Sequence, residues 1–166
     1  MASYKGFLGL WRPGTGNLPI WTSGSSLGAF VDLGNTYFKT GIRLAYLDYY
    51  DVFDSYTGLW VPGSGAQHFQ AEMDRDTFLS VDHDQFYAGR RLISLDRDDD
   101  EYIAVWRSGF GTGAQHVGVE LSGQDLEEED AQQRAKGRRM TILLQTSDEF
   151  TAVWRPGSGI EWFAYG

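Results

Sequence analysis

The chain has 166 residues, 42% of them hydrophobic and 15% aromatic, which suits one domain with a packed core and excludes a disordered segment. The 23 acidic and 14 basic residues give a net charge of −9, which disfavours nucleic acid and anionic membranes as partners. The absence of cysteine excludes disulfides and thiolate metal sites.

The N-terminus carries no long apolar run behind a basic start. We therefore predict no signal peptide, and a cytoplasmic location is the default expectation. No segment approaches the roughly 18 apolar residues that a membrane helix needs, so we expect no membrane association.

The first predicted element is a strand that ends in Trp and leads into a glycine-rich turn. The same pattern occurs four times, about every 48 residues, in segments 7–16, 56–65, 102–113 and 150–159. A period of this length indicates one supersecondary unit used several times. In each copy an aromatic residue, a small residue and Trp lie at alternate positions, so they share one face of the strand. We interpret the four Trp residues as core, with a partly exposed binding platform as the alternative.

After each turn the pattern predicts a short strand, a short helix and then a second strand. The helix has an apolar anchor at Phe30, Phe78 or Leu126, eleven residues before a glycine that ends it. The helical pattern is clearest at 124–136, whereas Gly34 and the Asp-His-Asp of 82–84 interrupt the other two copies. The second strands are predicted at 44–47, 92–95 and 140–144.

These elements predict a mainly β fold with short helices, in a single domain spanning 1–166. We place the three units at 12–60, 61–106 and 107–154. Because the chain starts and ends inside a unit, we expect 1–11 and 155–166 to close the units into a pseudo-threefold ring, which would remove exposed strand edges. A linear stack of three units is the alternative.

One motif resembles a known family. Phe78, then Gly89-Arg-Arg91-Leu92, then Tyr102-Ile-Ala-Val-Trp106, together with the two sister copies, is similar to a family of bacterial tandem repeats that also forms the N-terminal module of polyglycine hydrolases. The resemblance implies a repeat module without a firmly assigned activity. It also implies that catalysis belongs to a separate serine hydrolase domain with Ser-x-x-Lys, and no Ser in this chain has Lys three residues later.

The candidate ligand-binding residues lie at the turn ends, where loops gather on rigid strands. They are Gln67, His68, Gln115, His116, Trp162, Arg12, Arg107 and Arg155. Two copies of Gly-Ala-Gln-His match closely, whereas the others carry Pro19 or Trp162 at the His position, so we expect two similar sites. Glycan or peptide would bind weakly at each site and gain avidity from multivalency.

Other patterns have structural interpretations. His68 with Glu72, and His116 with Glu120, have a spacing that a metal pair could use, but the other copies lack it. The acidic segment 96–101 begins like a calcium loop but lacks the glycine and the final glutamate, so we interpret it as a solvated hairpin loop. We predict no metal and no cofactor. The recurring Arg43, Arg91 and Arg139 are expected to pair with carboxylates or loop carbonyls.

The sequence therefore favours a non-enzymatic β-repeat module that binds a glycan or peptide at repeated shallow sites. A structural or self-associating module without a small ligand is the first alternative. A hydrolase that uses acidic residues of one unit is the second. The oligomeric state stays open.

Overall fold

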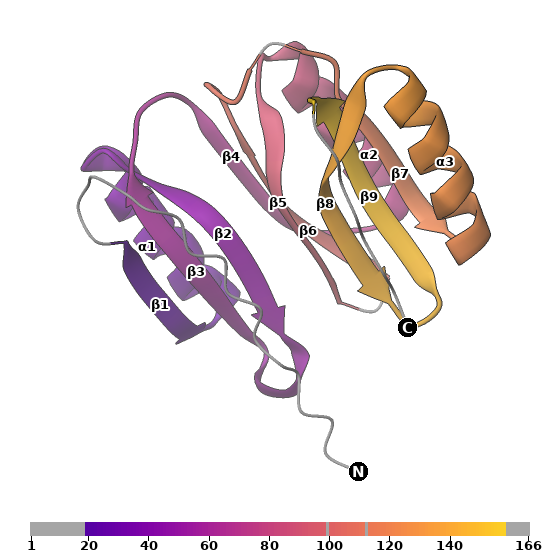
Figure 1. The fold of residues 1–166 in the computed structure, drawn as a ribbon. Coiled ribbons are helices and arrows are strands. Elements are labelled where there is room, and N and C mark those ends of the chain that lie inside the picture. Colours follow the sequence, from indigo (N-terminus) through magenta and orange to yellow (C-terminus); the bar gives the residue numbers. More distant parts are fainter. Residues whose placement is uncertain (1–18, 99, 112, 159–166) are drawn as a thin grey trace.

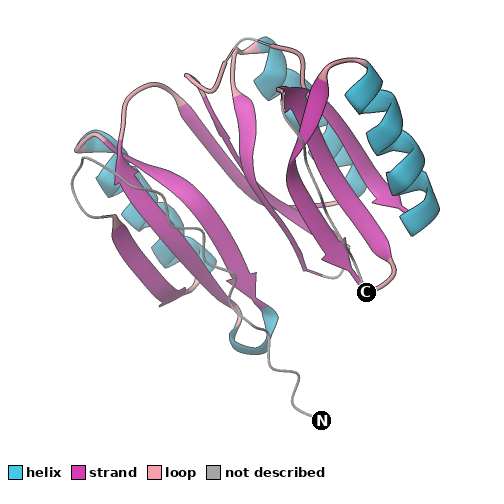
Figure 2. Ribbon diagram, viewed as in Figure 1, coloured by secondary structure: helices cyan, strands magenta, loops and turns pink. Residues whose placement is uncertain are grey.

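The structure is a computed structural model that describes residues 19–98, 100–111 and 113–158. Its described part is mainly β, with short helices, and contains three separate three-stranded antiparallel sheets. Each sheet carries one helix (Figure 2). No helix in these residues is long and apolar enough to cross a membrane.

Three units follow one another along the chain, and each has the order strand, helix, strand, strand. The first unit contains β1 (Ile20–Ser25), α1 (Leu27–Lys39), β2 (Ile42–Tyr50) and β3 (Ser55–Pro62), with a 3-10 turn at Asp51–Phe53. The second unit contains β4 (Gln67–Met73), α2 (Arg75–Tyr87), β5 (Arg91–Asp98) and β6 (Glu101–Arg107). The third unit contains β7 (His116–Leu121), α3 (Gly123–Ala135), β8 (Arg138–Thr146) and β9 (Glu149–Pro156). In every sheet the last strand of the unit lies in the middle.

The Trp strands β3, β6 and β9 are these central strands, which explains their apolar character on both faces. Trp60, Trp106 and Trp154 are at most 1% exposed, so the interpretation of these residues as core is confirmed. The small residue two positions earlier leaves room for neighbouring rings: a Cβ at Gly58 would lie 2.9 Å from the Phe30 ring. Trp11 lies outside the described residues.

Each helix has 13 residues and ends just before a glycine in the left-handed region, with φ of 79° at Gly41, 79° at Gly89 and 74° at Gly137. The predicted glycine stops are thus confirmed. The anchors Phe30, Phe78 and Leu126 are buried, as expected.

The predicted interruptions at Gly34 and at residues 82–84 do not occur, because α1 and α2 run through them. The physical reason lies in the packing. Gly34 faces the ring of Trp60, and Asp82 accepts a hydrogen bond from Trp106, so both residues have partners in the sheet beneath the helix.

The expected closed arrangement is not present in the described residues. Strand β5 of the middle unit contacts both β2 and β8, and the middle unit lies between the other two (Figure 1). Each sheet completes its strand pairing within its own unit, so the units meet through side chains and no shared ladder joins them. The closing segment 1–11 and most of 155–166 lie outside the described residues.

Candidate functional site

The two predicted glutamines lie where one unit meets the next. Gln67 of the second unit accepts the backbone N–H of Leu44 through its Oε1 at 2.9 Å, and Gln115 accepts that of Leu92 at 3.1 Å. Both N–H groups lie beside a bulge, where the pairing of the strand with its neighbour shifts register. Because β2 and β5 are edge strands of their sheets, the glutamines satisfy backbone donors that face away from the ladder. We call the contact between the first and second units the first junction, and that between the second and third units the second junction.

The recurring arginines reinforce both junctions. Arg43 Nε donates to the carbonyl of Gly65 at 2.9 Å, and Arg91 Nε donates to that of Gly113 at 3.0 Å. Each guanidinium also donates to a carbonyl at the end of its helix, that of Phe38 or Phe86, and lies over the ring of that same phenylalanine. The predicted pairing with loop carbonyls is confirmed for Arg43 and Arg91.

Arg107 and Arg155 lie inside the same two junctions, beside Arg43 and Arg91 respectively. Burial lowers the pKa of Arg107, and the neighbouring charge of Arg43 adds to this effect. Burial also lowers the pKa of Arg155 to about 10; Arg91 adds to this, whereas the carboxylate of Asp82 opposes it. The electrostatic surroundings of the two arginines thus differ, because an acidic group influences the pKa of Arg155 but not that of Arg107.

The predicted histidines lie half-buried, each directly opposite a core Trp across the strand pair. The His68 and Trp106 ring centroids are 5.7 Å apart, and those of His116 and Trp154 are 5.6 Å apart. His116 Nε2 lies 2.9 Å from a carboxylate oxygen of Glu129, a contact that is an ion pair only when the imidazole is protonated. Burial lowers the pKa of His116, and Glu129 is the main opposing influence.

The spacing of His68 with Glu72, and of His116 with Glu120, does not produce metal sites. The glutamates have φ of 55° and 53°, in bulges where β4 and β7 shift register, so strict alternation fails before it reaches them. The part of the chain that is described contains no group of three His, Cys, Asp or Glu residues that could hold a metal. The predicted site residues Arg12 and Trp162 lie outside the described residues.

A pocket of about 310 Å³ opens at the first junction. Gln67, His68 and Phe69 of β4 form one wall, so two of the predicted site residues line it. The first unit contributes the remaining lining residues, which are Phe30, Val31, Gly34, Asn35, Phe38, Leu44 and Trp60. Most of the lining residues are therefore apolar, but the surface that they leave open to the pocket is mixed, with polar groups from Gln67, His68 and Asn35.

At the second junction the corresponding position carries a carboxylate. Asp82, the eighth residue of α2, accepts hydrogen bonds from Trp106 Nε1 and from Gln115 Nε2, both at 2.8 Å. Burial raises the pKa of Asp82, while these two hydrogen bonds and the charges of Arg155 and Arg91 oppose the rise. In the third unit Asp130, the eighth residue of α3, accepts from Trp154 Nε1 at 2.9 Å in the same way.

The eighth residue of α1 is Gly34, and the indole ring of Trp60, which packs against it, has the opposite orientation to that of Trp106. Trp60 Nε1 donates to Thr22 Oγ1 of β1 at 2.9 Å instead of to the helix. The opposite edge of the ring faces α1, so that a Cβ at Gly34 would lie 3.2 Å from Trp60 Cη2. The first junction therefore presents the carbon edge of the indole and no carboxylate at this position.

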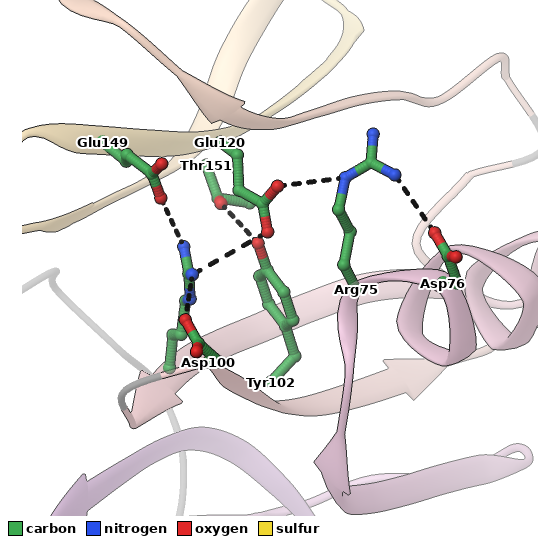
Figure 3. A network of polar contacts seen from close by, with 8 residues as sticks. Arg75, Asp76, Asp100, Tyr102, Glu120, Glu149 and Thr151 are labelled. Atoms are coloured by element: carbon green, nitrogen blue, oxygen red, sulfur yellow. Dashed lines mark hydrogen bonds and ion pairs between the residues drawn. The ribbon is translucent and has the colours of Figure 1, made fainter.

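A second polar cluster joins the second and third units around Arg97. Figure 3 shows its carboxylates Asp100, Glu120 and Glu149 gathered together. The Arg97 side chain is 5% exposed and forms ion pairs with Glu149 at 3.1 Å, Asp100 at 3.2 Å and Glu120 at 3.8 Å. Arg75 Nε lies 3.2 Å from the other oxygen of Glu120. Guanidinium groups thus hold these carboxylates, and we interpret the cluster as a structural ion-pair network.

The acidic segment that begins like a calcium loop is the end of β5 and its turn into β6. Asp96 accepts the backbone N–H of Tyr49 at 2.6 Å and that of Arg97 at 2.9 Å, and Asp100 pairs with Arg97. The carboxylates of Asp96 and Asp100 are therefore engaged by protein groups.

Sequence reasoning missed the contrast between Gly34 and Asp82. The available signal was the spacing from each helix-ending glycine: Gly34, Asp82 and Asp130 each stand seven residues before one.

Comparison of the chain with family models, with curated proteins and with solved structures finds no match.

Proposed function

We propose that the protein is a non-enzymatic binding module made of three copies of one repeating unit, and that its ligand site is the pocket at the first junction. The observation that carries this proposal is the cavity of about 310 Å³ with Gln67 and His68 in its wall. Pockets of this size that combine apolar side chains with a few polar groups are typical of small-molecule sites.

The wall favours a ligand with an apolar body over a glycan. Among the repeated Trp residues, Trp60, Trp106 and Trp154 are buried in the core and cannot stack on sugars. Val31 and Phe38, by contrast, remain 37% and 40% exposed at the pocket. A peptide with a large apolar side chain, or a small organic molecule of similar character, therefore fits this site better. One site, and not two equal ones, is expected because Asp82 occupies the corresponding position at the second junction.

A substitution at the rim of the pocket tests this proposal. Val31 is the fifth residue of α1, and the fifth residue of α3 is the exposed Glu127, which lies outside the pocket. We expect Val31→Trp to abolish binding of short peptides with apolar residues, measured by ligand-observed NMR, and Glu127→Trp to leave it unchanged. Equal binding by both variants would place the site elsewhere, and stronger binding of soluble oligosaccharides would favour the glycan alternative.

A structural module without a small ligand is the second candidate, since the junctions are tied directly by side chains. Ser94 Oγ accepts the backbone N–H of Leu47 at 2.9 Å, and Asp96 accepts that of Tyr49. Light scattering over a range of concentrations tests self-association, which this candidate predicts and the binding proposal does not require.

A further inference from the structure

The first junction lacks a negative group that the second junction supplies from its own helix. At the second junction, Asp82 accepts from Gln115 Nε2, while Gln115 Oε1 accepts the N–H of Leu92 and a guanidinium N–H of Arg155 at 3.3 Å. At the first junction, Gln67 binds the N–H of Leu44 in the same way, but Gly34 stands in place of Asp82. The acceptor is therefore missing, and of its two donors only the glutamine amide is retained, because Trp60 Nε1 donates to Thr22.

Two donors at the first junction are left without the partners that their counterparts have. The Nε2 group of Gln67 makes no hydrogen bond within the described residues, and its amide is oriented because Oε1 faces Leu44 N. Arg107, the cross-strand neighbour of Gln67, is 6% exposed, and no described carboxylate forms an ion pair with it. Its Nη1 donates to the carbonyl of Leu44 at 3.5 Å, and its buried Nε, like that of Arg155, lacks a hydrogen-bond partner among the described residues. Arg107 does not itself line the pocket. An unused amide donor in the pocket wall, with a buried cation beside it on the neighbouring strand, favours an anionic group there.

The remainder of the pocket suits an apolar body. Because the indole of Trp60 is turned over, its carbon edge faces the helix side of the pocket near Gly34. Phe30, Phe38 and Phe69 complete this wall. Burial of aromatic or aliphatic groups against such a wall supplies affinity, and a polar group at the other end supplies orientation.

We propose that this pocket binds a carboxylate attached to an aromatic or branched aliphatic body. The carboxylate takes the place that Asp82 has at the second junction, where it accepts from Gln67 Nε2 close to Arg107. The body lies against Phe38 and Phe69, beside the buried Trp60. This inference rests on the proposed function, because it assigns a ligand class to the same pocket. A free organic acid and the C-terminal residue of a peptide share this chemistry.

Matched pairs of probes separate the charge from the body. The first pair is 3-phenylpropanoate and 3-phenylpropanamide, and the second is N-acetylphenylalanine and its amide, which mimics a peptide C-terminus. We expect each acid to bind at least about tenfold more tightly than its amide by calorimetry at pH 7 and low salt, since charge-assisted hydrogen bonds are stronger than neutral ones. Tighter binding of the second acid would indicate a peptide C-terminus, and tighter binding of the first a free acid.

Two variants test the position of the carboxylate. Gln67→Glu keeps an acceptor for Leu44 N but adds a negative charge, so we expect it to weaken both acids at least about tenfold and to leave the amides unchanged. Gly34→Asp supplies the carboxylate from the protein, so it should abolish binding of acids and amides alike. Gln132→Glu, the same charge change on the exposed side of α3, is the control and should change neither.

The outcomes distinguish this inference from the proposed function. Equal affinity for acid and amide, unaffected by Gln67→Glu, would overturn the proposed recognition of a carboxylate but would leave the pocket as a binding site. Failure of all four probes to bind the unmodified protein, with no ligand protons in contact with Phe38 or Phe69 by NMR, would overturn both.

Discussion

The two junctions use the same joining residues and differ in what lies between them. At each, a glutamine holds a strand bulge and an arginine holds the carbonyl of a glycine. At the second junction Asp82 fills the space and bonds to Trp106 and Gln115, whereas at the first Gly34 leaves a cavity and Trp60 turns to Thr22. The glutamine and arginine contacts thus form with either residue at this position, and that helix residue determines whether a carboxylate or a pocket lies between the units.

Removal of the Asp82 carboxylate is expected to have the largest effect on the stability of the protein. Asp82→Ala leaves Trp106 Nε1 and Gln115 Nε2 without their acceptor and takes away the acidic neighbour of Arg155. We expect a loss of about 2–4 kcal/mol in the free energy of unfolding, measured by urea denaturation. Asp76→Ala, on the exposed first turn of α2, is the control and should cost less than about 0.5 kcal/mol. Similar losses in both variants would show that the hydrogen bonds of Asp82 do not stabilise the second junction.

The orientation of the Trp60 ring is expected to couple the effects that substitutions at Gly58 and Gly34 have on stability. A Cβ at Gly58 would lie 2.7 Å from Trp60 Nε1, although Ala104 and Ala152 occupy the corresponding positions opposite Gln70 and Gly118. We expect Gly58→Ala alone to cost about 1–3 kcal/mol, because the ring has no space to move.

Gly34→Asp gives the indole N–H an acceptor on the helix, so Trp60 is able to adopt the orientation of Trp106. In the double variant the cost of Gly58→Ala should then fall by about 1 kcal/mol or more, a coupling that a double-mutant cycle measures directly. Additive costs would mean that the orientation of Trp60 is not set by these two positions.

The smallest expected effect concerns pH and the third unit. Because burial lowers the pKa of His116 in the folded protein, the unfolded state binds the proton more readily. The contribution of this group to stability is complete above its unfolded pKa of about 6.5 and decreases as the pH falls below that value. His116→Gln should remove a small part of the decrease in stability between about pH 7 and pH 5, measured by thermal unfolding. An identical pH profile in the variant would exclude a role for this histidine.

The repeated features of the fold were predictable because each has a local cause. The glycine after each helix is required by a positive φ, and the anchors Phe30, Phe78 and Leu126 follow from apolar spacing. The prediction of a closed ring was wrong for the described residues, since it depended on terminal segments whose strand partners no local pattern specifies. The unit borders proposed from the sequence remain a prediction.

At the candidate site, sequence reasoning located Gln67 and His68 but assigned Gln115 and His116 the same role. A repeat pattern gives equal weight to equal residues, whereas the space beside them depends on a third residue in another element. Gly34 has no side chain to attract attention, and its effect passes through the orientation of Trp60. Such an effect requires three-dimensional packing and is not encoded in spacing alone.

The arginine contacts described above both run from one unit to the unit that follows it in the chain. Arg43 of the first unit reaches the turn that leads into the second, and Arg91 of the second reaches the turn that leads into the third. Each joint therefore links only nearest neighbours and always in the same sense along the chain. If the three units behave as repeats, stability is approximately a sum of unit and nearest-neighbour interface contributions. The middle unit, which is coupled on both sides, is accordingly the place where amide protons should exchange most slowly.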